Sequence, residues 1–452
     1  MENNTTDNKT NRQTFSRTYS WFVVALLMTA YTLSFIDRQI LSLMVAPLKS
    51  DLNLSDTQIS LLQGVAFALL YTIAGIPLGR LADRVNRKWL IVAGITFWSL
   101  MTFGCGLAKS YVSLFLMRMG VGVGEAVLNP SSFSLISDYF KKEDLGKAIG
   151  VYAAGIYIGA GLAYIVGGSV IGFVEGMFGA SVELLGGITI RTWQLTFMIV
   201  GLPGVLVAAA IALLLREPER TGMLPQHKGE QKQAAFSTVL RFIWLHKSTF
   251  LPMFFGVSMI SSLGYAVLSW GPEFFIRTYG LSKTSTGLGF GLVVMIFGSI
   301  GITHAGFIGD RMFANGKTDA YFRVTAIAGL GLILPCIIMP LCNTALLAFV
   351  FLAPIIYFSA FPYSVLPAAI QAIAPNQMRG QISAIYLFVS NITGIGMGPL
   401  AVGLLTDQFF HDDGALRYSL MILCVVTAPL TAIIFAFGFK GLSKSIEAAS
   451  AW

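Results

Sequence analysis

Charged residues are scarce in this chain of 452 residues: 12% are Asp, Glu, Lys or Arg, whereas 55% are hydrophobic. Soluble domains carry about 25% charged residues, so the composition excludes an ordinary soluble enzyme, a disordered chain and a nucleic-acid-binding protein. Cysteine is also scarce. The four cysteines lie in apolar stretches without paired spacing, and they therefore form neither a disulfide framework nor a metal site.

Sequence motifs for nucleotide or acyl chemistry are missing as well. The nearest approach to a phosphate-binding loop, Asn315 to Thr318, has Arg311 where the first glycine belongs, which argues against an ATP-driven pump. The chain has no G-x-S-x-G motif of acyl hydrolases. We therefore expect no cofactor, no metal and no enzymatic activity. A membrane-embedded lipid-modifying enzyme is a distant alternative, and the lack of a nucleophile or metal constellation argues against it.

Long apolar runs are what this sequence has in abundance. A helix needs about 20 mostly apolar residues to cross the core of a bilayer, and twelve such runs occur. They lie at 20–46, 57–79, 89–108, 111–135, 146–172, 194–215, 250–272, 284–308, 322–341, 345–371, 381–405 and 417–439. The sequence therefore predicts an all-α integral membrane protein with twelve transmembrane helices.

A polar connection in the middle of the chain divides the twelve runs into six and six. The expected organisation is a disordered cytoplasmic tail (1–18), an N-terminal six-helix bundle (19–215), a cytoplasmic linker (216–249), a C-terminal six-helix bundle (250–440) and a second cytoplasmic tail (441–452). Residues 234–247 of the linker have the pattern of a short amphipathic helix on the membrane surface.

The distribution of basic residues predicts the orientation. If the N-terminus is cytoplasmic, 22 of the thirty Lys and Arg residues lie in cytoplasmic loops and tails, and six lie on the opposite side. Cytoplasmic loops of membrane proteins carry an excess of Lys and Arg. We therefore expect a multi-pass protein of the cytoplasmic membrane with both termini in the cytoplasm, which accounts for the net charge of +8 without nucleic acid.

A loop motif occurs once in each half of the chain. Gly79 to Arg84 and Gly306 to Arg311 both read G-x-x-small-Asp-Arg, 227 residues apart. Duplication of a six-span unit is typical of transporters, whose binding site lies between the repeats near the bilayer midplane. We interpret the loops as a cytoplasmic gate that closes in one state, although a simple topological anchor is the alternative. The gate residues are Gly79, Asp83, Arg84, Arg87, Asp310 and Arg311.

The segment from Gly79 to Lys88 resembles the loop motif of the major facilitator superfamily, and the twelve runs extend this resemblance over the whole chain. Ser34 to Gln39 in the first span and Arg118 to Ala126 in the fourth are similar to the spinster branch, especially its bacterial members. The resemblance implies the major facilitator fold, with two pseudo-symmetric six-helix bundles, alternating access, and transport of lysophospholipids or sphingosine-1-phosphate. Related carriers of organic anions and sugar acids also have an acidic–basic pair in the first span.

Four charged residues lie inside predicted spans, and all are in the N-terminal half: Asp37, Arg38, Arg118 and Glu125. Charges at membrane depth are costly and mark functional sites. Arg118 and Glu125 are seven residues apart, about 10.5 Å along a helix, which is too far for a direct pair. We expect Asp37 to pair with Arg118 or a polar network near it, and Glu125 to have weaker compensation. The C-terminal spans contain no Asp, Glu, Lys or Arg in their predicted interiors.

These charges suggest proton coupling. A carboxyl group in an apolar site can titrate near neutral pH when its arginine partner moves away, so Asp37 and Glu125 are the predicted proton carriers. Arg38 and Arg118 are assigned to an anionic headgroup or to counter-ion roles, because arginine binds phosphate or carboxylate with two hydrogen bonds. A static ion pair that only fixes helix packing is the alternative.

The C-terminal half offers an apolar and aromatic wall. Its candidate cavity-lining residues, for which packing is the alternative role, are Tyr265, Trp270, Tyr357, Phe361, Tyr363 and Asn391. A cavity charged on one wall and aromatic on the other suits an amphiphile. We therefore expect a monomeric secondary transporter in the lipid bilayer, with protons and an anionic amphiphile as its partners. A proton-coupled carrier of small organic or sugar acids is the alternative.

Overall fold

The structure is a computed structural model in which residues 15–82, 84–140, 142–184, 188–220 and 235–449 are described. Within these residues, twelve helices are long and apolar enough to cross a membrane, which confirms the predicted number. Their most apolar stretches have mean hydropathies between 1.3 and 2.6. Helices are the form that such segments take in lipid, because every backbone N–H and C=O must then be paired within the segment.

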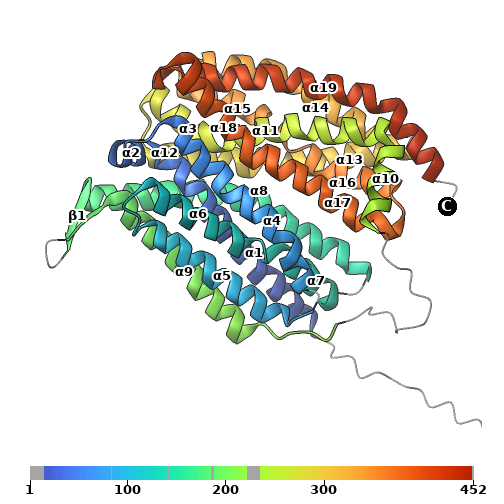
Figure 1. The fold of residues 1–452 in the computed structure, drawn as a ribbon, viewed down its shortest axis with the longest axis horizontal. Helices are drawn as coiled ribbons and strands as arrows, with labels where there is room; N and C mark the ends of the chain where they lie inside the picture. The colour runs from blue at the N-terminus through green and yellow to red at the C-terminus, as the bar shows by residue number, and fades with distance from the viewer. Residues whose placement is uncertain (1–14, 83, 141, 185–187, 221–234, 450–452) are drawn as a thin grey trace, which may run out of the picture.

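The first six spans form the lower half of the molecule in Figure 1, coloured blue to green. Their elements are α1 (Arg17–Gln39), the 3-10 helix η1 (Ile40–Leu43), α2 (Val45–Leu52), α3 (Asp56–Ser60), the π-helical segment η2 (Leu61–Val65), α4 (Ala66–Ala82), α5 (Arg87–Cys105), α6 (Tyr111–Glu125), α7 (Leu128–Tyr139), α8 (Lys142–Phe178), β1 (Ser181–Leu184), β2 (Ile188–Arg191) and α9 (Thr192–Leu214).

The last six spans form the upper half, coloured yellow to red (Figure 1). Their elements are α10 (Phe236–Leu245), α11 (Lys247–Tyr279), α12 (Lys283–Val293), the π-helical segment η3 (Val294–Gly298), α13 (Ser299–Ala314), α14 (Ala320–Leu341), α15 (Ala345–Ser359), α16 (Pro362–Ile373), α17 (Asn376–Asn391), the π-helical segment η4 (Ile392–Met397), α18 (Gly398–Leu404), the π-helical segment η5 (Leu405–Phe410), the 3-10 helix η6 (Asp413–Ala415) and α19 (Leu416–Ala449).

Two details differ from the expected organisation. The last helix continues to Ala449, past residue 441, where a tail was expected. Strands β1 and β2 form an antiparallel hairpin between the fifth and sixth spans, with Ser181 opposite Arg191. The amphipathic pattern within 234–247 corresponds to α10, in which Phe236, Leu240 and Trp244 are exposed.

The start of α1 and the end of α19 lie on the same face of the molecule, at the right of Figure 1; we call it the terminal face. The hairpin lies at the opposite end, which we call the far face. Helices often end there at sequence signals: Ser110 and Ser282 cap the starts of α6 and α12, and Gly280 ends α11 with a φ of +67°.

Close backbone contacts join the two halves. A Cβ atom on Gly291 of α12 would lie 2.4 Å from the carbonyl oxygen of Gly161 in α8, and one on Gly287 would lie 2.3 Å from that of Tyr164. Only glycine permits such an approach at both positions. The helix pair α8–α12 thus packs backbone against backbone, and α3 makes a similar approach to α18, where a Cβ on Gly403 would lie 2.7 Å from the carbonyl oxygen of Asp56.

Candidate functional site: a charged cavity between the halves

All four charged residues predicted inside the first and fourth spans are enclosed by protein. Asp37, Arg118 and Glu125 are at most 3% exposed, and the side chain of Arg38 is 12% exposed. Asp37 and Arg38 are in the last turn of α1, and Arg118 and Glu125 are in α6. The four residues therefore form one group within the N-terminal half.

The pairing within this group differs from the one expected. Arg38 donates from Nε to Glu125 Oε2 at 2.6 Å, and its Nη2 lies 2.5 Å from the same oxygen. Arg118 Nη1 donates instead to the main-chain carbonyl oxygen of Asp37 at 2.7 Å, and no ion pair joins Arg118 to the Asp37 carboxylate among the described residues. The expectation that Glu125 would have the weaker compensation is thus wrong.

Helix geometry explains this exchange of partners. The last four carbonyl groups of an α-helix lack intrahelical partners, and Asp37 lies in the last turn of α1, before the chain continues as a 3-10 helix. Its carbonyl oxygen is therefore available to Arg118. Two carboxylate oxygens, Asp37 Oδ1 and Glu125 Oε1, are buried and have no hydrogen-bond partner among the described residues.

Three aromatic rings surround the guanidinium of Arg38. Its central carbon lies 4.5 Å from the ring centre of Phe67, 5.0 Å from Tyr71 and 5.1 Å from Phe35. Arginine is attracted to aromatic faces at such distances. The sequence analysis missed Phe67 and Tyr71, although their i, i+4 spacing on an apolar span is the signal for a shared helix face.

A small cavity of about 20 Å³, which is room for about one water molecule, lies beside Arg38, between the two halves. Gln39, Ser42, Gln63 and Phe67 complete its N-terminal wall, and Tyr265, Ser269 and Ile395 form its C-terminal wall. Most of these side chains are polar. The cavity thus offers one cation together with amide and hydroxyl groups, and its C-terminal wall carries no formal charge.

Of the six residues expected to line a cavity from the C-terminal half, Tyr265 borders this one. Trp270 is fully buried, and its Nε1 donates to the carbonyl oxygen of Pro399 at 3.1 Å and to Ser60 Oγ at 3.2 Å. Trp270 thus takes part in packing between the halves.

The other four candidates lie away from the described lining of this cavity. Phe361 is 2% exposed and packs on Tyr357, whose hydroxyl contacts His304 Nδ1. The hydroxyl of Tyr363 donates to Ser261 Oγ at 3.4 Å. Asn391 ends α17 and is half-buried.

A second charged cluster, at the far face, joins the halves. Arg277 of α11 holds Asp56 with two hydrogen bonds, Nη1 to Oδ2 at 2.7 Å and Nη2 to Oδ1 at 2.9 Å. Lys49 adds contacts of 2.7 Å to Asp56 and 2.6 Å to Asp413. Asp56 is completely buried, so its charge is balanced by both cations.

The buried acid Glu273 corrects a further expectation. It lies in α11, is 1% exposed, and accepts a hydrogen bond from Arg277 Nε at 2.7 Å. The predicted seventh span stopped at residue 272, whereas α11 continues to Tyr279 with Pro272 inside it. The C-terminal half therefore does carry ionisable residues inside a spanning helix, near its far end.

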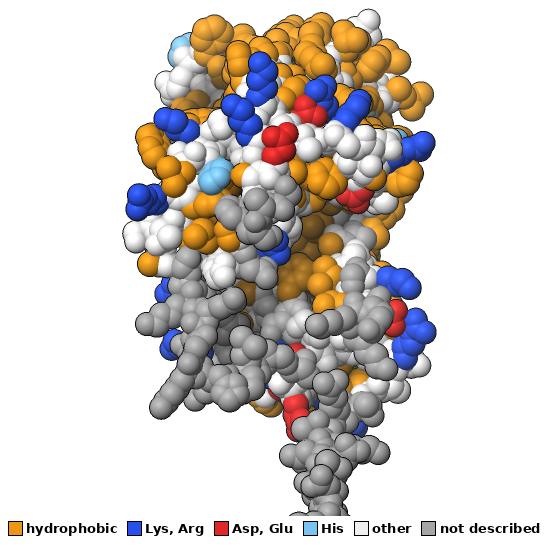
Figure 2. Space-filling view, turned by 90° about the vertical axis from the view of Figure 1, so that its right-hand side faces the viewer, with side chains coloured by type: hydrophobic (Ala, Val, Ile, Leu, Met, Phe, Trp, Pro, Cys, Tyr) orange, Lys and Arg blue, Asp and Glu red, His pale blue; other side chains and the backbone are white. Residues whose placement is uncertain are grey.

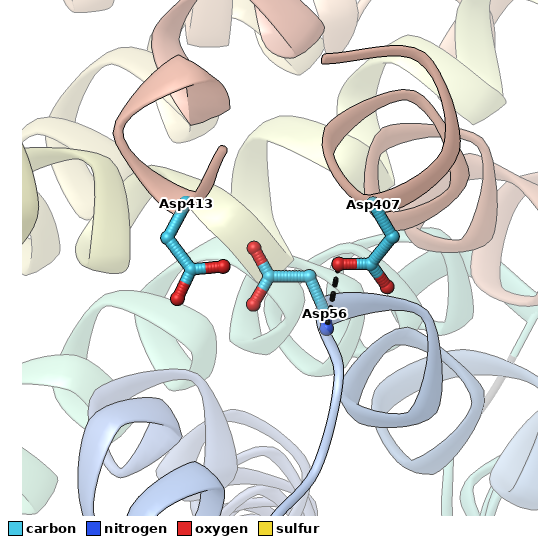
Figure 3. A group of neighbouring side chains, drawn as sticks. All are labelled: Asp56, Asp407 and Asp413. Carbon is cyan, nitrogen blue, oxygen red and sulfur yellow. Dashed lines mark hydrogen bonds between the residues drawn. The ribbon is translucent and has the colours of Figure 1, made fainter. Parts of the chain in front are cut away.

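Asp407 binds the N-terminus of a helix in the other half. Its carboxylate accepts hydrogen bonds from the main-chain N–H groups of Asp56 at 3.2 Å and Thr57 at 2.6 Å, at the start of α3. Figure 3 shows Asp56 reaching between Asp407 and Asp413 of the C-terminal half. Oxygens of these three carboxylates lie within 4.8 Å of one another, and Lys49, Arg277 and the helix N–H groups account for this arrangement.

The contacts between the halves are concentrated toward the far face. Besides the cluster around Asp56, the hydroxyl of Tyr164 donates to the carbonyl oxygen of Leu268 at 2.5 Å, and Lys283 pairs with Glu175. Among the described residues, every hydrogen bond between the halves belongs to this side or to the cavity level. The far face is thus closed.

The terminal face is different. Figure 2 looks onto it and shows Lys and Arg side chains around both halves, with apolar side chains in a recess between them. Of the predicted gate residues, Gly79 is half-buried, Arg84, Asp310 and Arg311 are exposed, and Asp83 lies outside the described residues. Arg87 is buried and bonded within its own half, to Asp138 and to Glu217 Oε1 at 2.7 Å.

Known proteins resemble this chain over almost its full length. An "MFS-type efflux pump" of Mycolicibacterium smegmatis is 28% identical over 413 residues, which cover 90% of each chain. A "probable L-galactonate transporter" of Escherichia coli is 25% identical, covering 95% of this chain and 92% of that protein.

The solved structure of a bacterial homologue of the human lysosomal transporter spinster, described as inward-facing and unoccupied, is 26% identical. It has a TM-score of 0.81 and covers 96% of this chain and 99% of its own. The model of the Major Facilitator Superfamily matches residues 27–399, from the first span into the eleventh. With the twelve spans in two halves and a cavity between them, this match identifies the chain as a member of the Major Facilitator Superfamily.

Proposed function

We propose that this transporter moves an anionic substrate by alternating access, with Arg38 as the anion-binding group and the cavity beside it as the binding site. The observation that carries the proposal is the Arg38–Glu125 pair at the interface of the halves. The cavity must widen to admit an anion, which then meets a guanidinium whose only hydrogen-bonded partner among the described residues is one carboxylate.

Proton coupling follows from competition for Arg38. While Glu125 is ionised, it occupies Arg38 and opposes a second anion. Protonation of Glu125 removes this competition and frees the guanidinium for substrate. Glu125 Oε1, buried and without a described partner, is available for the proton. Asp37, whose Oδ1 is likewise unpaired, is the second candidate carrier.

The first candidate substrate is an anionic amphiphile of the lysophospholipid or sphingosine-1-phosphate class. The similarity to the spinster homologue and the apolar side chains Phe67 and Ile395 at the cavity support this class. The second candidate is a small organic or sugar acid, which is favoured by the amide and hydroxyl groups in the lining and by the similarity to the galactonate transporter.

Uptake into proteoliposomes separates these classes. The purified full chain is reconstituted and supplied with labelled lysophosphatidate, sphingosine-1-phosphate, gluconate or lactate, with and without an imposed pH gradient. Accumulation of an anion that responds to the gradient supports the proposal. Uptake of none of these anions, or uptake that the pH gradient leaves unchanged, contradicts it.

The same scheme assigns the terminal face to the cytoplasm, as the basic residues on it favour. The closed far face then corresponds to an inward-facing state. A reporter fused after Trp452 that is active only in the cytoplasm tests the assignment, and activity of a periplasm-specific reporter at that position contradicts it.

A further inference from the structure

The side-chain amide of Gln63 is buried at the cavity. Its nitrogen has a hydrogen-bond partner, whereas its oxygen has none among the described residues. Gln63 lies in the π-helical segment η2, and such segments are frequent at functional sites. The residue is 8% exposed and lines the cavity together with Arg38. Its Nε2 donates to the main-chain carbonyl oxygen of Ser269 at 3.3 Å, whereas its Oε1 is buried and has no partner among the described residues.

The orientation of this amide follows from its neighbour. Exchanging the nitrogen and the oxygen would bring Oε1 against the carbonyl oxygen of Ser269, and two acceptors would then face each other. Ser269 therefore keeps the nitrogen of Gln63 toward the C-terminal half. The remaining atom, Gln63 Oε1, is a hydrogen-bond acceptor, so a ligand that donates a hydrogen bond would pair it.

Two other polar side chains of the N-terminal wall, Gln39 and Ser42, have hydrogen-bond contacts. The hydroxyl of Tyr164 lies 2.9 Å from Gln39 Oε1 and 2.5 Å from the carbonyl oxygen of Leu268, and its one hydrogen can be donated to only one of them. Ser42 Oγ donates to the carbonyl oxygen of Gln39 at 2.6 Å. Arg38 binds Glu125 through Nε and Nη2, and its Nη1 makes no hydrogen bond to a described residue. Among the described residues, the N-terminal wall thus leaves Nη1 of Arg38 and the amide nitrogen of Gln39 as unused donors and Oε1 of Gln63 as an unused acceptor.

We propose that Gln63 makes the cavity selective for anions that also carry a hydroxyl group, with the anionic group on Arg38 and the hydroxyl donating to Gln63 Oε1. The inference rests on the proposed function and narrows its substrate. A site built to bond a hydroxyl rejects the analogue that lacks it, because the buried acceptor is then left unpaired. The required hydroxyl occurs both in sugar acids and in the glycerol of lysophosphatidate.

The test uses two ligand pairs that each differ in one hydroxyl: lactate against propionate, and lysophosphatidate against its 2-O-methyl ether. Affinities are measured by calorimetry on the purified full chain and on Gln63→Met, which has similar length but no acceptor amide. In the parent, we expect the hydroxylated member of one pair to bind at least about tenfold more tightly. In Gln63→Met, this member should weaken about tenfold while its partner stays within about twofold.

The difference between pair members isolates the hydroxyl, because loss of the Ser269 contact affects both members equally. Gln371→Met, at an exposed glutamine of α16, is the matched control and should bind like the parent. If Gln63→Met fails to fold, Gln63→Leu replaces it. The ligand pair that binds shows whether the hydroxyl belongs to a hydroxy acid or to the glycerol of a lysophospholipid.

The experiment distinguishes failure of the role of Gln63 from failure of the proposed function. If the parent binds both members of a pair equally, or if Gln63→Met weakens both members equally, the role of Gln63 is overturned and the anion transporter stands. If the parent binds no member of either pair and transports none, the proposed function itself fails, and the inference fails with it.

Discussion

Asp407 and Thr57 lie in opposite halves of the molecule, yet the carboxylate of Asp407 accepts the main-chain N–H of Thr57 at 2.6 Å. Such a carboxylate normally caps its own helix. Here α3 belongs to the N-terminal half and has its own N-cap, Ser55, whereas Asp407 comes from η5 in the C-terminal half and binds the N–H groups of Asp56 and Thr57. The N–H groups of Asp56 and Thr57 are therefore paired while the far face is closed, and they lose this partner when it opens.

Replacing Asp407 with Ala should favour opening of the far face. Loss of a hydrogen bond to a charged group costs about 1.5–3 kcal/mol, which shifts a two-state equilibrium by roughly ten- to a hundredfold. Spin labels at the exposed residues Lys109 and Asn343 would report a larger population of long distances. Asp412→Ala is the control, because the Asp412 carboxylate accepts the Gly414 N–H within its own loop and bonds no other described residue. An identical distance distribution in both variants would show that Asp407 does not hold this face.

Gly291→Ala should prevent the far face from closing. The added Cβ would lie 2.4 Å from the carbonyl oxygen of Gly161, and a backbone atom cannot move aside as a flexible side chain can. We expect transport to be lost while ligand binding from the far face is retained. Gly176→Ala serves as the control, since a Cβ there meets nothing within 4 Å. Full transport by Gly291→Ala would mean that α8 and α12 do not need this approach.

Glu125→Gln should uncouple transport from the pH gradient. The amide mimics a permanently protonated carboxyl group, so Arg38 loses its ionic partner and stays available to the substrate. Ligand binding should be retained and its dependence on pH reduced, as measured by calorimetry between about pH 5 and 8. The exposed Glu183 provides the control variant Glu183→Gln. A Glu125→Gln protein that still responds to the gradient like the parent would assign the proton to Asp37.

Arg38→Ala should weaken a phosphorylated amphiphile far more than its dephosphorylated analogue. Loss of a hydrogen bond to a charged group costs about 1.5–3 kcal/mol, or roughly ten- to a hundredfold in affinity. Arg118→Ala should be less selective, because Arg118 bonds the main chain of Asp37. Dissociation constants of both ligands test the selectivity expected for Arg38→Ala. Arg80→Ala, at an exposed position, is the control. If Arg38→Ala weakens the binding of both ligands equally, Arg38 does not bind the phosphate of the headgroup.

The length and apolarity of each span were predictable from sequence because lipid imposes a minimum length and tolerates few charges. The ends of the helices were less predictable. The seventh span was predicted to stop at residue 272, but α11 continues to Tyr279, and Arg277 pairs with the buried acid Glu273 in this extension. Arg277 also binds Asp56 of the other half, and a local pattern does not report such a distant partner.

The location of the charged group was also predictable, whereas its pairing was not. Asp37 and Arg38 point in directions about 100° apart on a helix, so the rotational setting of α1 about its axis decides which of them faces Glu125. Gln63 gave no signal at all, since a single glutamine in an apolar span has no periodicity, and its meaning depends on Ser269 in the other half.

The hairpin β1–β2 is bonded to the N-terminal half. Asp51 of α2 pairs with Arg191 at 3.1 Å and accepts a hydrogen bond from Trp193 Nε1 at 2.7 Å, and all three residues belong to that half. The hairpin also stands apart from the helices at the far face (Figure 1). An antibody fragment that binds only this hairpin would therefore add mass and a visible landmark for single-particle imaging without bridging the two halves.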